Sequence, residues 1–200
     1  MSVQPPPDAQ DHRGGRAAFS REALPALVVL AVIVAVVSGG YLAGGALAQP
    51  VGPPVSVGGA VELQPISGWT VAARLGTDHV RLTRGGGNLD VLVSAATDPA
   101  SLLHRYLSAL GRPPSQLSVS PDPRSVTLES GAGGLRVFYV GLVPSREVAS
   151  IEGEITAVVT PGGVGVLFDG WAPKGLFSYV ENDLEHMIGT ARISPRGGGS

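Results

Sequence analysis

The chain has 200 residues, which is enough for one folded domain of ordinary size with additional segments. Its 14 basic and 16 acidic residues leave a formal net charge of −2, so no excess of basic residues indicates a nucleic-acid partner. The absence of cysteine excludes disulfides, thiolate metal sites, a cysteine nucleophile and a lipid-modified cysteine anchor.

An apolar segment near the N-terminus is the strongest signal. Residues 26–48 consist almost entirely of Leu, Val, Ile, Ala and Gly, without one charged side chain. A helix of this length spans a hydrocarbon core of ~30 Å at a rise of ~1.5 Å per residue. Arginines precede the segment, and no Lys or Arg follows it until Arg74. The positive-inside rule therefore predicts a single-pass cell-membrane protein with a cytoplasmic N-terminus and an extracytoplasmic domain.

Two alternatives concern the same segment. The sequence Ala46-Leu47-Ala48 is an A-x-A pattern, so a cleaved signal peptide remains the competing interpretation. The long leader and the length of the apolar segment favour an uncleaved anchor. Gly40 and Gly44 form a G-x-x-x-G motif, a candidate contact between membrane helices. Chance occurrence in a glycine-rich span is the favoured explanation of this motif.

Composition divides the rest of the chain. Residues 1–25, which precede the membrane segment, lack apolar periodicity and are predicted to be a disordered cytoplasmic tail. Residues 49–59 are rich in Pro and Gly and are predicted to be a linker. Residues 60–193 are expected to form the folded domain, and 194–200 a second disordered tail.

The domain contains short β-rich runs and two segments of helical periodicity. Asp98 and Pro99 are typical of a helix start, and Gly111 of its end. The predicted elements in chain order are strands 69–74, 80–83 and 89–95, a helix 98–111, strands 125–129, 135–143, 151–160 and 164–169, and a helix 176–190.

This order predicts an α+β fold, an antiparallel β-sheet packed against two amphipathic helices. The sheet then has one core that includes Trp69, and Leu184 is expected in the seam between the last helix and the sheet.

No set of residues for catalysis could be assembled. Neither a nucleophile with a base nor a cluster of metal ligands is indicated, so we expect no enzyme activity, no metal and no cofactor. Glu152 and Glu154 lie two apart in a predicted strand and are expected to share a solvent-facing side.

The segment Asp169-Gly170-Trp171-Ala172-Pro173-Lys174 is the candidate binding site. We predict that it is a strand-to-helix loop in which Trp171, Lys174 (the chain's only lysine) and Asp169 contact a partner. The alternative is that Trp171 folds back over the sheet edge, as large aromatic side chains usually do, and this is the favoured explanation for Trp171.

Several of these features together resemble the PsbP-like fold family. They are Pro65-Ile66-Ser67-Gly68-Trp69 before the first strand, the hairpin followed by helix 98–111, and the run Gly165–Pro173 before a helix ending Asp183-Leu-Glu-His-Met187-Ile188. The family includes photosystem extrinsic proteins and LpqN-type actinobacterial lipoproteins. The resemblance implies a noncatalytic domain that docks on a larger membrane or envelope assembly. It carries no catalytic residues, and the missing lipoprotein cysteine would be replaced by the membrane helix.

The leading hypothesis is therefore a membrane-anchored extracytoplasmic module that binds an envelope protein through a monomeric domain. The alternative is a small-molecule or lipid carrier that uses the space between the sheet and the C-terminal helix.

Overall fold

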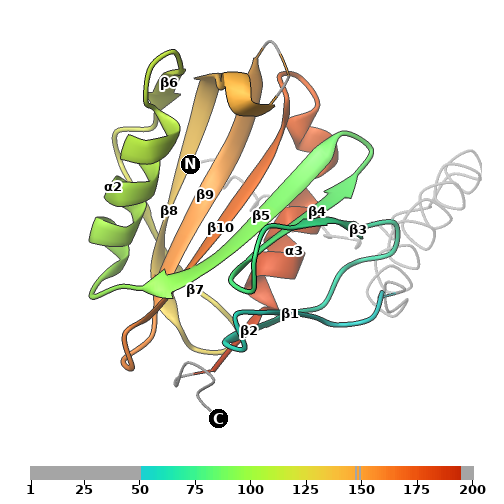
Figure 1. Ribbon diagram of the computed structural model, residues 1–200, viewed down its shortest axis with the longest axis vertical. Coiled ribbons are helices and arrows are strands. Elements are labelled where there is room, and N and C mark those ends of the chain that lie inside the picture. Colours follow the sequence, from blue (N-terminus) through green and yellow to red (C-terminus); the bar gives the residue numbers. More distant parts are fainter. Residues whose placement is uncertain (1–50, 147, 149, 195–200) are drawn as a thin grey trace, which may run out of the picture. The chain divides into compact units, whose positions relative to one another are not determined.

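The computed structural model of the chain describes residues 51–146, 148 and 150–194 (Figure 1). Two α-helices and eleven strands follow one another in this part of the chain, with a short 3-10 helix η1 before β9 and another, η2, before α3. In order they are β1 (Val55–Val57), β2 (Val61–Leu63), β3 (Thr70–Arg74), β4 (His79–Arg84), β5 (Gly87–Ala95), α2 (Pro99–Leu110), β6 (Gln116–Val119), β7 (Arg124–Thr127), β8 (Gly133–Leu142), η1 (Pro144–Arg146), β9 (Ile151–Val159), β10 (Val164–Pro173), η2 (Phe177–Tyr179), α3 (Glu181–Gly189) and β11 (Arg192–Ile193).

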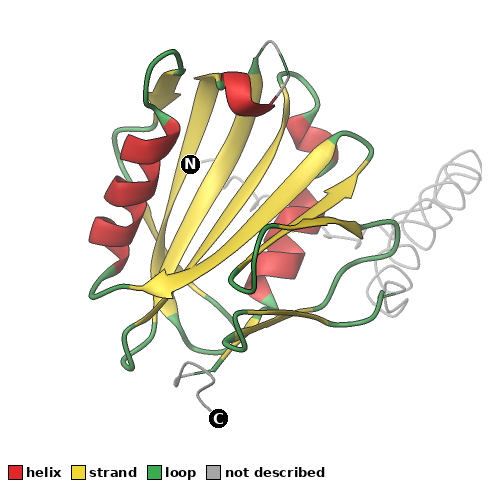
Figure 2. Ribbon diagram, in the orientation of Figure 1, coloured by secondary structure: helices red, strands yellow, loops and turns green. Residues whose placement is uncertain are grey.

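Eight of the strands form one antiparallel sheet (Figure 2). Its order is β3-β4-β5-β10-β9-β8-β6, and β7 also pairs with β8. The long central strands β5, β10, β9 and β8 are neighbours that cross the whole sheet. The three short strands β1, β2 and β11 form a separate small antiparallel sheet. The predicted α+β fold with an antiparallel sheet and two helices is confirmed.

Each face of the large sheet has its own core. Phe168 packs into the core with α3 and the small sheet, whereas its neighbour Leu167 packs into the core with α2. This alternation along β10 places the two helices on opposite faces, because successive strand residues point to opposite sides. The sheet therefore has two hydrophobic cores, one on each face, where a single core was predicted. Trp69 and Leu184 lie in the α3 core, as predicted.

Local signals account for the best-predicted elements. Gly85 and Gly86 form the β4–β5 turn with φ of 54° and 88°, a conformation that favours glycine. Asp98 caps α2, its carboxylate accepting a hydrogen bond of 2.8 Å from the Ser101 amide. Gly111 follows the last helical residue and donates its N–H to the Leu107 carbonyl. The predicted hairpin and first helix are thus confirmed.

The structure departs from the predicted elements in four respects. Part of the predicted linker forms β1, because Val55 and Val57 are buried and β1 pairs with β2. Strand β10 extends to Pro173, since its ladder with β9 continues through the predicted loop. The last helix is interrupted between η2 and α3. Three short strands were not predicted: β2, β6 and β11.

The predicted N-terminal tail, the membrane segment 26–48 with Gly40 and Gly44, and residues 195–200 lie outside the described residues. Among the residues that the structure describes, no helix has both the length and the apolar character needed to cross a membrane.

Candidate functional site: a groove beside a buried charge cluster

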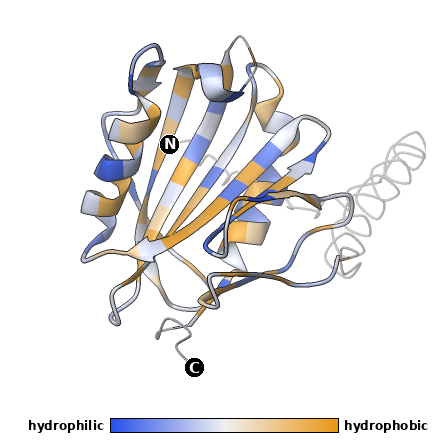
Figure 3. Ribbon diagram, viewed as in Figure 1, coloured by the Kyte–Doolittle hydropathy of each residue, from blue (hydrophilic) through white to orange (hydrophobic). Residues whose placement is uncertain are grey.

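Two aspartates face each other inside the α2 side of the sheet. Asp90 of β5 and Asp169 of β10 are register partners in neighbouring strands. Both are buried, with 2% and 0% of their surface exposed. Figure 3 marks hydrophilic residues inside the otherwise apolar central strands. Buried carboxylates require partners for their charge, so the surrounding residues decide what this pair can do.

Asp90 is held by three side chains. Arg81 donates from Nε to Oδ1 at 2.8 Å and from Nη2 to Oδ2 at 3.0 Å, a bidentate pair. The His79 ring contacts Oδ1 at 3.1 Å, and the Trp171 indole N–H donates to Oδ2 at 3.1 Å. Burial would raise the pKa of Asp90, but these hydrogen bonds outweigh it and hold the pKa below its ordinary value.

Asp169 has an equally complete set of partners. It forms a buried ion pair with Arg146 of η1 and accepts hydrogen bonds from Tyr106 of α2 at 2.6 Å and Tyr139 of β8 at 2.7 Å. Burial raises the pKa of both tyrosines, and the neighbouring Asp169 charge raises it further. Burial would lower the pKa of Arg146, but the same charge outweighs it and raises the pKa.

Trp171 connects the two halves of the cluster. The guanidinium carbon of Arg146 lies 4.5 Å from the Trp171 ring centroid, and that of Arg81 lies 5.7 Å from it. Gly153, opposite Trp171 in β9, leaves the room this packing needs. A Cβ at Gly153 would lie 2.9 Å from both Trp171 Cβ and the Tyr139 hydroxyl. We call the set Asp90, Asp169, Arg81, Arg146, His79, Trp171, Tyr106 and Tyr139 the charge cluster.

The pairing in the charge cluster leaves Asp90 and the two tyrosines unsuited to act as a general acid or base near neutral pH. The pKa of Asp90 is low and those of both tyrosines are high, so these groups do not exchange protons there. Each aspartate has an arginine partner. The cluster instead joins β4, β5, β10, β8, η1 and α2 into one rigid unit.

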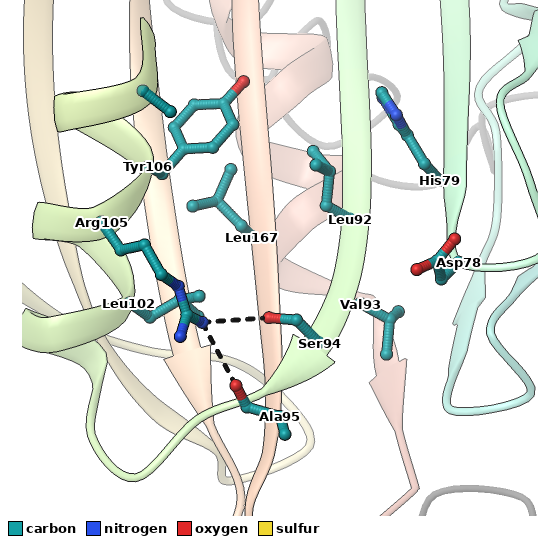
Figure 4. Close-up of a pocket in the computed structure, with 11 residues that line it drawn as sticks. Asp78, His79, Leu92, Val93, Ser94, Ala95, Leu102, Arg105, Tyr106 and Leu167 are labelled. Atoms are coloured by element: carbon teal, nitrogen blue, oxygen red, sulfur yellow. Dashed lines mark hydrogen bonds between the residues drawn. The ribbon is translucent and has the colours of Figure 1, made fainter.

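A groove of about 360 Å³ lies next to this rigid unit, between α2 and strands β4 and β5 (Figure 4). Helix α2 packs mainly against β8, β9 and β10, and its Arg105 side chain reaches β5. The floor is mainly apolar, formed by Leu92, Leu102 and Leu167 with Ala95 and Ala109 at the sides. Apolar clefts with a few polar groups at the rim are typical of binding sites.

The rims of the groove carry both signs of charge. Asp78 and His79 lie on the β4 side, and Arg105 of α2 lies on the other (Figure 4). Arg105 Nη2 donates to the Ala95 carbonyl at 3.2 Å and to Ser94 Oγ at 3.4 Å. A partner that buries an apolar side chain on the floor would meet an acidic group on one rim and a basic group on the other.

Of the three predicted binding residues, two are buried and one is exposed. Trp171 and Asp169 lie in β10 and are 4% and 0% exposed, so the predicted surface loop is wrong at both. The alternative was right that Trp171 is buried, but Trp171 lies within the central strand β10 and does not fold back over a sheet edge. Lys174 is exposed just after β10, where its amide donates to the Ser150 carbonyl at 3.0 Å. Whether any of the three contacts a partner stays a prediction.

The two strand glutamates do share one face, but it is not solvent-facing as predicted. Helix α3 and η2 cover it, so Glu154 is fully buried and Glu152 is half-buried. Glu152 accepts hydrogen bonds from the amides of Gly175 at 2.7 Å and Phe177 at 3.3 Å. It therefore stabilises the turn that precedes α3.

The sequence reasoning missed most of the charge cluster. Asp90 lies within an apolar strand and could have been singled out, because an acidic residue there requires a buried partner. Arg81, Arg146, Tyr106 and Tyr139 come from four different elements. No spacing in the sequence brings them together.

No protein-family model matches the chain, and no curated protein matches its sequence. Among solved structures, the chain is similar to the solution structure of cyanobacterial PsbP (CyanoP) from Synechocystis sp. PCC 6803. The two are 13% identical with a TM-score of 0.53, over 71% of this chain and 92% of that chain. A point mutant of protein Mog1 matches at 11% identity and a TM-score of 0.49, over 72% of this chain and 96% of that chain. The chain thus has a PsbP-like fold, as the resemblance predicted.

Proposed function

We propose that this protein is a noncatalytic binding module, tethered to the cell membrane by residues 26–48, that docks its extracytoplasmic domain on an envelope protein. The groove between α2 and β5 is the proposed docking site. A partner segment places an apolar side chain on the floor formed by Leu92, Leu102 and Leu167. Its charged groups pair with Arg105 on one rim and Asp78 on the other.

One observation carries this proposal: an open apolar groove borders a charge cluster whose ionised groups are already paired. Satisfied buried charges make a rigid wall, and a preformed site loses little entropy on binding. The same pairing argues against a catalytic role for Asp90, Tyr106 and Tyr139, because the pKa of Asp90 is lowered and those of the two tyrosines are raised away from neutral pH.

The carrier hypothesis has less support. It requires space between the sheet and the C-terminal helix, and Leu184, Met187 and Ile188 of α3 fill that space with no exposed surface. The Cβ of a residue at Gly170 would lie 2.8 Å from Leu184, which shows how closely α3 approaches β10.

Co-purification of the full chain from gently solubilised membranes tests the docking site. Ala109 is exposed on α2 and lines the groove, so Ala109→Glu places a charge over the apolar floor without changing the core. Ser108→Glu is the matched control, since Ser108 is exposed on the same helix and does not line the groove. Loss of a stoichiometric partner with Ala109→Glu alone supports the proposal. Equal recovery with both variants contradicts it.

The tether is tested separately by mass spectrometry of the membrane-bound protein. An intact N-terminus supports the anchor. A mature chain that begins at Gln49 establishes the signal-peptide alternative and leaves the groove proposal unaffected.

A further inference from the structure

Glu154 differs from every other buried acid that the structure describes. It lies in β9 on the α3 side of the sheet with no exposed surface. Neither of its carboxylate oxygens has a hydrogen-bond partner among the described residues. The nearest cation is Arg136 of β8, whose Nη1 lies 3.4 Å from Glu154 Oε2. A buried carboxylate with so little compensation is costly when it is ionised.

The same arginine nitrogen also holds helix α3. Arg136 Nη1 donates to Oε1 of Glu185 at 2.8 Å, and Arg136 Nε donates to Thr156 Oγ1 at 3.1 Å. The side chain of Arg136 is 14% exposed and that of Glu185 is 51% exposed. Glu154 of the sheet and Glu185 of the helix therefore share one arginine nitrogen, which hydrogen-bonds to Glu185 and not to Glu154.

We propose that Glu154, Arg136 and Glu185 form a pH-sensitive latch that holds α3 on the sheet at mildly acidic pH and loosens it above neutral pH. When Glu154 is protonated it is neutral, and Arg136 ties Glu185 of α3 to β8. When Glu154 loses its proton, the buried charge draws Arg136 away from Glu185 and favours openings of α3 that admit water to the carboxylate.

The electrostatic surroundings support this direction. The pKa of Glu154 is raised to about 7: burial is the largest cause, Arg136 lowers the pKa, and Glu185 and Glu181 of α3 raise it. Two further charged groups lie on this face. Glu152 is two residues away in β9, and Arg124 of β7 is the register partner of Arg136 and lies 5.8 Å from the Phe138 ring.

The sign of the effect follows from linkage. The pKa of Glu154 is about 7 in the closed structure and 4.5 for an ordinary glutamate, so the closed form binds the proton more tightly. Opening is therefore favoured as the pH rises between these values. For an opening that fully hydrates the carboxylate, the opening equilibrium constant increases about 30-fold between pH 5.5 and pH 8.

Hydrogen exchange of the full chain in detergent tests the latch. After correction for intrinsic exchange rates, the amides of Leu184, Met187 and Ile188 are expected to lose protection as the pH rises, with a midpoint near 7. Amides of Leu102 and Leu103 in α2 are the internal reference and should not change in this way. Glu154→Gln, which is neutral throughout, should remove the pH dependence. Glu185→Gln should lower α3 protection at pH 5.5, because Arg136 then has no ionised partner on the helix.

A second measurement covers the case in which Glu154→Gln does not fold. The carboxyl carbon of Glu154 in isotope-labelled wild-type protein should titrate near pH 7 by NMR, in the same range as the loss of α3 protection. Titration near 4.5, or pH-dependent α3 protection that persists in Glu154→Gln, would overturn the proposal. The groove and the tether do not enter either measurement.

Discussion

The two faces of the large sheet bury acidic residues in opposite ways. On the α2 face, Asp90 and Asp169 each have an arginine and several hydrogen-bond donors. On the α3 face, Glu154 has neither a hydrogen bond nor an arginine of its own within the described part of the chain, since Arg136 is shared with Glu185. The difference shows that burial alone does not determine the ionisation of a carboxyl group. The number of donors aimed at it decides the sign of the pKa shift.

The largest loss of stability on the α3 face is expected from a new buried charge that has no partner. Leu184→Asp places a carboxylate over Gly170, where the wild-type side chain is fully buried. We expect the domain to unfold, because an unpaired buried charge costs more than most domains can tolerate. Fluorescence of Trp69 and Trp171 reports this, since the chain has no other tryptophan. A native spectrum for this variant would show that the α3 seam is assigned incorrectly.

Removing one ion pair on the α2 face should lower the free energy of unfolding by less than Leu184→Asp does, but the loss should still be large. Arg146→Met removes the cation beside Asp169 and leaves that buried carboxylate without its charge partner. The expected loss is about 3–5 kcal/mol in the free energy of unfolding. The double variant Arg146→Met/Asp169→Asn is the control, because it removes both charges. Chemical denaturation should show that the double variant recovers part of the free energy of unfolding that Arg146→Met loses. If it recovers none, the loss in Arg146→Met does not come from the unpaired charge of Asp169.

Substitution of Trp171 and Lys174 tests whether each of these predicted binding residues also contributes to the stability of the domain. Trp171→Ala/Lys174→Ala should lower the melting temperature markedly, because truncating a buried tryptophan costs about 3–5 kcal/mol. Lys174→Ala alone should leave it nearly unchanged, since Lys174 is exposed. If the double variant melts like the wild type, Trp171 is not a core residue and returns as a docking candidate.

These residues also show what could be predicted from sequence. The hairpin at Gly85 and the helix beginning at Asp98 were predicted correctly, because a turn and a cap depend on residues adjacent in the chain. The position of Trp171 within a strand and the burial of Glu154 were not predicted correctly. Each lies in a strand whose burial depends on helices distant in sequence, so local alternation could not say whether a face was covered. The groove depends on where α2 stops covering the sheet, which no local pattern encodes.

The pH dependence of stability sharpens the comparison, because the two faces should respond with opposite signs. The raised pKa of Glu154, about 7 against 4.5, contributes stability that is complete below pH 4.5 and is lost as the pH rises through 7. A shift of this size corresponds to about 3 kcal/mol. The lowered pKa of Asp90 contributes stability above its ordinary value of 3.8, which is lost as the pH falls below it.

Chemical denaturation at several pH values separates these two contributions. Glu154→Gln should flatten the decline between pH 4.5 and 7 and leave the acid limb below pH 3.8 intact. A decline that is unchanged in this variant would assign it to other groups.

The smallest expected effect concerns how the two helices begin. Helix α2 has a side-chain cap, since Asp98 accepts from the Ser101 amide, whereas no side chain caps α3 at Val180. Hydrogen bonds from the Ser101 backbone and side chain hold the pKa of Asp98 below its ordinary value. Asp98→Ala should therefore destabilise the protein by about 1 kcal/mol, the usual cost of losing such a cap. Hydrogen exchange should place the loss of protection in the first turn of α2, with α3 unchanged. If α3 loses protection as well, the two faces are coupled through the sheet, and the latch at Glu154 would then also act on the groove beside α2.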